Sequence, residues 1–124
     1  MARILCVDDE VHAVKLKCVI LETAGHQAVP ATSLASAVAL MESSSFDLIV
    51  TDWRLGSASG HDVVVAARKL TKVPVVVISG YFAEAFSAPD PLADYYLEKP
   101  VNPEELISVV NELVHSAGPS NAAP

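Results

Sequence analysis

The sequence lacks the long apolar run that a membrane-spanning helix requires. Hydrophobic residues make up 52% of the 124 residues and the mean hydropathy is +0.40. Even so, no stretch of the sequence approaches about 18 consecutive apolar residues. The N-terminal sequence MARILCVDDE becomes acidic too early for a secretory signal peptide. We therefore expect one cytoplasmic domain that does not bind a membrane.

Basic residues and cysteines are also scarce. Eight Lys and Arg residues stand against 15 Asp and Glu residues, which gives a formal net charge of −7. Because proteins that bind nucleic acids usually present a basic face, a direct nucleic-acid partner is disfavoured. The two cysteines, Cys6 and Cys18, fall in different apolar patterns and form no C-x-x-C pair, which predicts two buried free thiols.

Short runs rich in Val, Ile and Leu alternate with stretches of helical periodicity. The runs predict five strands: Arg3–Val7, Gln27–Pro30, Phe46–Thr51, Val73–Ser79 and Asp94–Leu97. The first, third and fourth are almost continuously apolar, as in parallel strands that are buried on both faces. Helices are predicted over Glu10–Ala24, Ser33–Ser43 and Gly60–Leu70, and from Pro103 onward behind the N-cap residue Asn102.

The repeated strand–helix units predict an α/β fold, a doubly wound five-stranded parallel sheet with helices on both faces. In the first helix, the residues expected to face this sheet are Val11, Val14, Cys18 and Leu21. The fourth helix is predicted to be short and to end near Ala88, because Pro89 and Pro91 cannot continue it. We expect residues 1–116 to form the domain and residues 117–124 to be a disordered tail.

Polar residues stand where the predicted strands end. Asp8–Glu10 follow the first strand and Asp52 ends the third, while Ser79 and Lys99 end the fourth and follow the fifth. Each of them could instead cap a helix or lie in a turn. Their shared edge favours a common site, since ligands of open α/β sheets bind at the carboxyl ends of the strands.

The residue types at this edge indicate phosphoryl chemistry. Clustered carboxylates repel one another unless a cation lies among them, and Mg²⁺ prefers such oxygen ligands. A lysine and a hydroxyl group can bind phosphoryl oxygens, and a carboxylate can act as the nucleophile. The sequence thus predicts a site for a divalent cation and a phosphoryl group.

Four segments, ILCVDDE, DLIVTDWRLGSASG, VPVVVISG and YYLEKP, together resemble the receiver domain of bacterial two-component response regulators, which is CheY-like. The resemblance covers Met1–Ser116 and implies a flavodoxin-like sheet with strand order 2-1-3-4-5. It also implies a signalling domain that is not an enzyme. This domain either stands alone or belongs to a longer chain such as a hybrid histidine kinase.

The resemblance assigns expected roles to the phosphoryl site. Asp52 is the expected phospho-acceptor, which receives its phosphoryl group from a sensor histidine kinase or a histidine phosphotransfer protein. Asp9 is the expected direct ligand of Mg²⁺ or Mn²⁺ and Asp8 a ligand through water, with Asp52 and the backbone carbonyl of Arg54 completing the protein ligands.

Further roles concern the switch. Lys99 is expected to pair with the acceptor carboxylate, Ser79 to be the switch hydroxyl and Tyr96 the switch aromatic. Phosphorylation would then change an output surface that contacts a downstream protein, in a monomer or a weak dimer. Gly56 departs from the family, which usually has Pro at that position.

Three other classes of protein compete with this interpretation. A haloacid-dehalogenase phosphatase needs a D-x-D-x-[TV] signature, which DDEVH does not supply. A flavin carrier of the same fold needs a phosphate loop after the first strand, where this chain is acidic. A receiver-like domain that binds proteins without taking phosphate is the remaining alternative, and the set Asp9, Asp52, Ser79 and Lys99 argues against it.

Glu10, Arg54 and Tyr81 occupy positions that tune the lifetime of the acyl phosphate in the family. A large cation at residue 54 and a large aromatic at residue 81 predict slow hydrolysis, because both can block water. We therefore expect an Arg54→Asn, Tyr81→Glu double variant to lose its phosphoryl group faster than the wild type. Autodephosphorylation rates of the two proteins would check this, and equal rates would contradict it.

Overall fold

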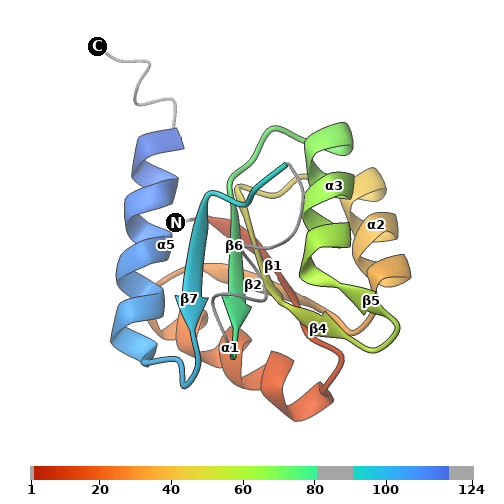
Figure 1. The fold of residues 1–124 in the computed structure, drawn as a ribbon. Coiled ribbons are helices and arrows are strands. Elements are labelled where there is room, and N and C mark those ends of the chain that lie inside the picture. The colour runs from red at the N-terminus through yellow and green to blue at the C-terminus, as the bar shows by residue number, and fades with distance from the viewer. Residues whose placement is uncertain (1, 81–90, 118–124) are drawn as a thin grey trace.

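The computed structural model describes residues 2–80 and 91–117. Five parallel strands form one sheet in the order β2-β1-β3-β6-β7 (Figure 1). These strands are β1 (Arg3–Val7), β2 (Gln27–Ala31), β3 (Leu48–Asp52), β6 (Val75–Ser79) and β7 (Tyr95–Glu98). Since β6 and β7 are the fourth and fifth strands of this sheet, the predicted order 2-1-3-4-5 is confirmed.

Helices cover both faces of the sheet, as predicted. The helices of the described residues are α1 (Val11–Thr23), α2 (Leu34–Ser43), α3 (Gly60–Leu70) and α5 (Pro103–Ala117). Helices α1 and α5 pack on one face, and α2 and α3 pack on the other (Figure 1). The predicted short fourth helix lies outside the described residues, and so does the tail beyond Ala117. Helix α5 ends at Ala117, one residue past the expected domain boundary at residue 116.

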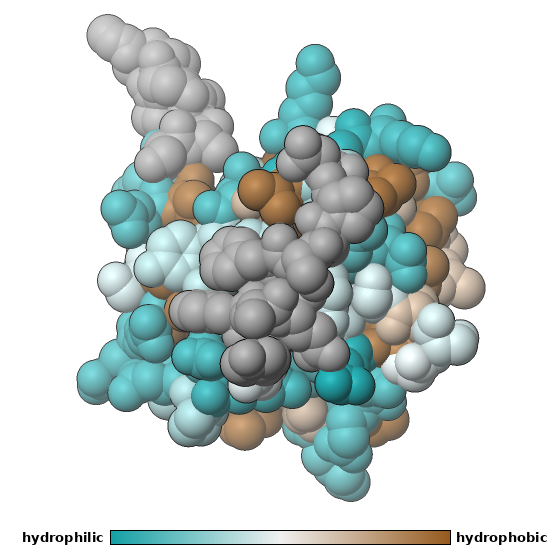
Figure 2. All heavy atoms as spheres, in the orientation of Figure 1, coloured by the Kyte–Doolittle hydropathy of each residue, from teal (hydrophilic) through white to brown (hydrophobic). Residues whose placement is uncertain are grey.

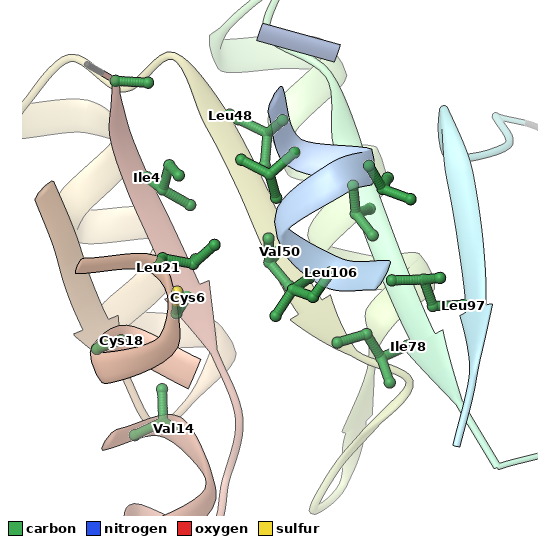
Figure 3. Close-up of a cluster of buried hydrophobic side chains, with 14 residues drawn as sticks. Ile4, Cys6, Val14, Cys18, Leu21, Leu48, Val50, Ile78, Leu97 and Leu106 are labelled. Atoms are coloured by element: carbon green, nitrogen blue, oxygen red, sulfur yellow. The ribbon is translucent and has the colours of Figure 1, made fainter. Parts of the chain in front are cut away.

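The core consists of two apolar layers separated by the sheet. Ile4, Val50 and Ile78 point to one face and pack with Leu21 of α1 and Leu106 of α5 (Figure 3). The alternate residues of the same strands pack with α2 and α3 on the other face. All residues of β3 and β6 are buried. This burial explains why their sequences are almost continuously apolar.

The two cysteines lie in the first of these layers and are buried free thiols, as predicted. A hydrogen bond with Cys18, together with burial, raises the pKa of the Cys6 thiol well above its usual value. The same hydrogen bond lowers the pKa of the Cys18 thiol.

The buried face of α1 differs from the prediction at two positions. Val14, Cys18 and Leu21 are buried as expected, but Val11 is 47% exposed. Val11 is the first helical residue and follows the edge at which β1 ends, so no strand lies beneath it. Lys17, which the apolar periodicity did not mark, takes a buried position on this helix.

Side chains cap the helices at their N-termini. Glu10, rather than Asp8 or Asp9, caps α1 by accepting a hydrogen bond from Ala13 N. Asn102 caps α5 as predicted, because its Oδ1 accepts hydrogen bonds from the backbone amides of Glu104 and Glu105. These bonds satisfy amide groups that have no partner within the helix.

A small hairpin after β3 was not predicted. Its strands, β4 (Arg54–Leu55) and β5 (Ala58–Ser59), pair antiparallel, and Gly56 turns the chain with a φ of +68°. Two-residue strands are too short to show a periodicity in the sequence. The hairpin leads directly from the end of β3 into α3.

The surface combines hydrophilic and hydrophobic areas. Figure 2 shows hydrophobic atoms over the side formed by α2 and α3, amid mainly hydrophilic ones. A shallow groove there is lined by Leu34, Val38, Ala66 and Leu70. Within residues 2–80 and 91–117, no helix has the length and apolar character to cross a membrane.

Candidate functional site

The strand register places the predicted site residues at one edge of the sheet. Val7 pairs with Thr51, so Asp8 and Asp52 are the next residues on neighbouring strands. Asp52 pairs with Ile78, which puts Ser79 one residue further along the adjacent strand. Neighbouring strands lie about 4.8 Å apart. The carboxylates and the hydroxyl therefore meet at the carboxyl edge, as the sequence predicted.

Asp52 is the centre of this edge. It is only 3% exposed, and its Oδ1 lies 2.7 Å from Nζ of Lys99. Its Oδ2 accepts a hydrogen bond of 3.2 Å from Arg54 N. The Lys99 side chain is 47% exposed, so its ammonium group reaches the buried carboxylate from the solvent side. The structure thus brings together the predicted acceptor and the predicted lysine.

A backbone hydrogen bond holds Lys99 in this place. Lys99 N donates to Ser79 O over 2.8 Å, which extends the pairing of β6 with β7 by one residue. The Ser79 side chain is fully buried at the same edge. Lysine and serine are therefore fixed next to each other by the sheet rather than by a flexible loop.

Asp8 is held by a second lysine. It is 4% exposed, and Lys17 Nζ donates a hydrogen bond to its Oδ2. Its Oδ1 accepts a hydrogen bond of 3.0 Å from Glu10 N. Both carboxylate oxygens of Asp8 thus have partners, and one of these partners was not foreseen from the sequence.

Asp9 points toward the surface instead. It is exposed and lines an open hollow with Trp53, Arg54 and Gly56. A Cβ atom at Gly56 would lie 3.9 Å from Asp9 Oδ2, so the β4–β5 turn passes beside this carboxylate. Asp9 is therefore open to solvent, in contrast to the buried carboxylates of Asp8 and Asp52.

The remaining predicted residues surround this edge. Tyr96 is half-buried in the layer that faces α2 and α3, and its hydroxyl oxygen accepts a hydrogen bond of 3.0 Å from Ala93 N. Trp53 is partly buried and packs against the same layer. Arg54 is exposed at the start of β4. Tyr81 lies outside the described residues.

The donor atoms at this edge suit a hard divalent cation. They are carboxylate oxygens, which Mg²⁺ prefers. Asp52 Oδ1 is buried, and its ion pair with Lys99 is its one polar contact found among the described residues, so this oxygen has acceptor capacity beyond that pair. The described part of the chain holds no ready-made group of three His, Cys, Asp or Glu side chains for a metal. The carboxylates of Asp8, Asp9 and Asp52 and their location at one edge fit such a cation, although Asp8 is already paired with Lys17.

The sequence matches the family model described as the response regulator receiver domain over residues 4–111. The chain belongs to this family. Receiver domains are signalling domains of two-component systems, so the CheY-like resemblance stated above is confirmed. The observed strand order agrees with this assignment.

Curated relatives of the receiver are bacterial regulators. The phosphate regulon transcriptional regulatory protein PhoB of Klebsiella pneumoniae is 31% identical over 122 residues, covering 94% of this chain and 53% of PhoB. The alginate biosynthesis transcriptional regulatory protein AlgB of Pseudomonas syringae is 36% identical over 107 residues, covering 84% of this chain and 24% of AlgB. The chain thus spans about half the length of the PhoB relatives.

Solved structures show the same fold. A CheY-like receiver domain protein from Methanospirillum hungatei superposes with a TM-score of 0.82 at 26% identity, covering 94% of this chain and 96% of that one. The response regulator TrrA from Thermotoga maritima, in complex with Mg²⁺ and BeF, gives a TM-score of 0.83 at 29% identity. That match covers 91% of this chain and 99% of TrrA.

Gly60 fixes helix α3 against the end of β3. Its amide donates a hydrogen bond of 2.7 Å to Trp53 O, and a Cβ atom at Gly60 would lie 2.8 Å from Asp52 O. Because that oxygen belongs to the backbone, a side chain at residue 60 would force the strand end or the helix to move. The position therefore requires glycine for a reason of space.

We expect Gly60→Ala to lower the free energy of unfolding by about 1–3 kcal/mol, as is usual for overpacked buried sites. Gly80→Ala is the matched control, since a Cβ atom at Gly80 meets nothing within 4 Å. The control should change stability by less than about 1 kcal/mol. Urea unfolding of both variants measures the difference, and equal midpoints would contradict the close approach at Gly60.

Proposed function

We propose that this receiver accepts a phosphoryl group on Asp52 and thereby switches its output surface. The observation that carries the proposal is the state of Asp52. It is a buried carboxylate on the last residue of a rigid strand, with a lysine ammonium group 2.7 Å away. Such a carboxylate is aimed by the sheet and is paired with a cation that can also bind phosphoryl oxygens.

In the proposed step, an oxygen of the Asp52 carboxylate attacks the phosphorus of a phosphohistidine. A P–O bond forms while the P–N bond breaks, and the electron pair of the broken bond returns to the imidazole of the donor. Lys99 neutralises charge on the phosphoryl oxygens throughout. The product is an acyl phosphate on Asp52.

Mg²⁺ or Mn²⁺ is the proposed cofactor of this transfer. Asp9 and Asp52 would hold the cation directly and Asp8 through water, together with the backbone carbonyl of Arg54. When bound, such a cation neutralises developing charge on the transferred group. The complex of TrrA with Mg²⁺ and BeF supports this part of the proposal.

Ser79 and Tyr96 are the proposed switch residues. Ser79 is buried next to Lys99, and Tyr96 lies two residues before Glu98 on the adjoining strand. A phosphoryl group adds charge and acceptor oxygens to which a hydroxyl can turn. The proposed consequence is a shift of the surface near β7 and α5, which a downstream protein would recognise.

The surface of α1 supports a protein as the phosphoryl donor. Val11, Leu16 and Val19 of this helix are 47%, 61% and 54% exposed. Since α1 begins three residues after Asp8, these apolar side chains extend from the site along the helix. A sensor histidine kinase or a histidine phosphotransfer protein is the proposed partner. The net charge of −7 disfavours direct binding to nucleic acid.

The proposal predicts phosphorylation by a small-molecule donor. Incubation with acetyl phosphate and Mg²⁺ should add one phosphoryl group to the wild type, and a chelator should suppress the gain. Asp52→Asn should show no gain, since its amide cannot form an acyl phosphate. Intact-mass spectrometry measures all three results.

Asp47→Asn provides the matched control, because Asp47 is exposed and directly precedes β3 at the opposite end from Asp52. This variant should gain the phosphoryl group like the wild type. No gain in folded wild-type protein would contradict the proposal and favour a receiver-like domain that binds proteins without phosphate. Circular dichroism establishes that each variant is folded.

A further inference from the structure

Lys17 is a charged residue on the buried face of helix α1, where the other buried side chains are apolar. It is 9% exposed and lies on the same buried face as Val14, Cys18 and Leu21. A buried ammonium group is costly unless it is paired. The aliphatic stem of a lysine can replace an apolar residue in such a place while its end reaches a partner.

The partner of Lys17 is Asp8. Lys17 Nζ donates to Asp8 Oδ2, and the two side chains are only 11% and 6% exposed. The other oxygen of Asp8 accepts the hydrogen bond from Glu10 N. Asp8 is therefore neutralised and held in place from within the protein.

This pair completes a balance of charge at the carboxyl edge. In the described part of the chain, each of the two buried carboxylates at this edge faces one lysine: Asp8 faces Lys17, and Asp52 faces Lys99. Lys99 is about half exposed and is part of the proposed phosphoryl site, whereas Lys17 is buried and approaches from the helix side. A divalent cation at this edge would meet one carboxylate whose charge Lys17 already balances.

We propose that Lys17 is a resident counter-cation that competes with the divalent metal for Asp8 and so weakens metal binding. The inference rests on the proposed metal site. In the metal-free protein, Lys17 stabilises the buried Asp8 carboxylate. A bound metal must then share Asp8 with Lys17 and be repelled by its positive charge. Lys17 is thus a positioning residue that sets the metal affinity of this receiver.

The test compares Lys17→Met with Lys15→Met. Methionine keeps the length and the apolar character of the lysine stem and removes the charge. Lys15 is exposed on the same helix, so its substitution changes the net charge equally without touching Asp8. Mg²⁺ is titrated at fixed pH and ionic strength, and binding is followed by the fluorescence of Trp53, the only tryptophan of the chain, which lines the hollow beside Asp9.

We expect Lys17→Met to bind Mg²⁺ about tenfold more tightly than the wild type, because an unscreened like charge has been removed from the site. Lys15→Met should stay within about twofold, since exposed charges are screened by solvent. Lys17→Arg keeps the charge and should bind Mg²⁺ like the wild type. In an Asp8→Asn background, Lys17→Met should no longer tighten binding, because the carboxylate for which the two cations compete is gone.

Thermal unfolding gives a second readout that does not depend on fluorescence. Without metal, Lys17→Met should unfold at a lower temperature than Lys15→Met, since it leaves a buried carboxylate unpaired. Added Mg²⁺ should raise the unfolding temperature of Lys17→Met more than that of the wild type. Unfolding temperatures with and without Mg²⁺ can be compared even for a variant whose free energy of unfolding is small.

Two results would overturn the inference in different ways. If the wild type binds Mg²⁺ and Lys17→Met binds it equally or more weakly, Lys17 does not compete with the metal and the proposed function stands. If neither protein binds Mg²⁺ by fluorescence or by thermal unfolding, the proposed metal site fails together with the role of Lys17.

Discussion

Among the residues that the structure describes, two carboxylates lie buried at the carboxyl edge of the sheet, and the site depends on how their charge is balanced. Asp8 and Asp52 are 4% and 3% exposed, and each faces a lysine from another element of the fold. A buried ion pair is costly to break, because removal of one partner leaves the other charged and desolvated. The ends of β1 and β3 are thereby tied to α1 and to the segment after β7.

This arrangement links the chemistry of Asp52 to distant parts of the fold. Lys99 follows β7 directly and is bonded through its backbone to Ser79, so under the proposed function a change of charge at Asp52 would act on two neighbouring strands. On the other side, Asp8 joins β1 to α1 through Lys17. A phosphoryl group or a metal would alter both pairs, since each adds charge where the lysines now supply it. Receiver domains use such a local change to bias the surface that they present.

Much of the fold and of the candidate site could be predicted from the sequence, because the strands are buried on both faces. The continuous apolar runs of β1, β3 and β6 fixed the order of elements, and the polar residues after them fixed the edge at which the site lies. The strand ends placed Asp52 and Lys99 at the same edge, whereas their pairing was expected only from the resemblance to receiver domains, and the ion pair in the structure agrees with it. The strand boundaries shifted by one or two residues, as at β3, which begins at Leu48 and includes Asp52.

Three features were missed or wrongly predicted from the sequence, and each has a physical cause. Lys17 was missed because helical periodicity is read from apolar residues, and a lysine whose stem is buried carries no such signal. Val11 was placed in the core because it continues the apolar spacing of α1, although the helix begins beyond the sheet. The β4–β5 hairpin was missed because its strands are two residues long, and only Gly56 marks the turn.

The most direct test of the central claim is to locate the phosphoryl group itself. The chain would be phosphorylated and treated with borohydride, which reduces an acyl phosphate of aspartate to homoserine. Peptide mass spectrometry would then identify the converted residue. The account predicts homoserine at position 52 alone. Conversion at Asp8 or Asp9 instead, with position 52 unchanged, would contradict it.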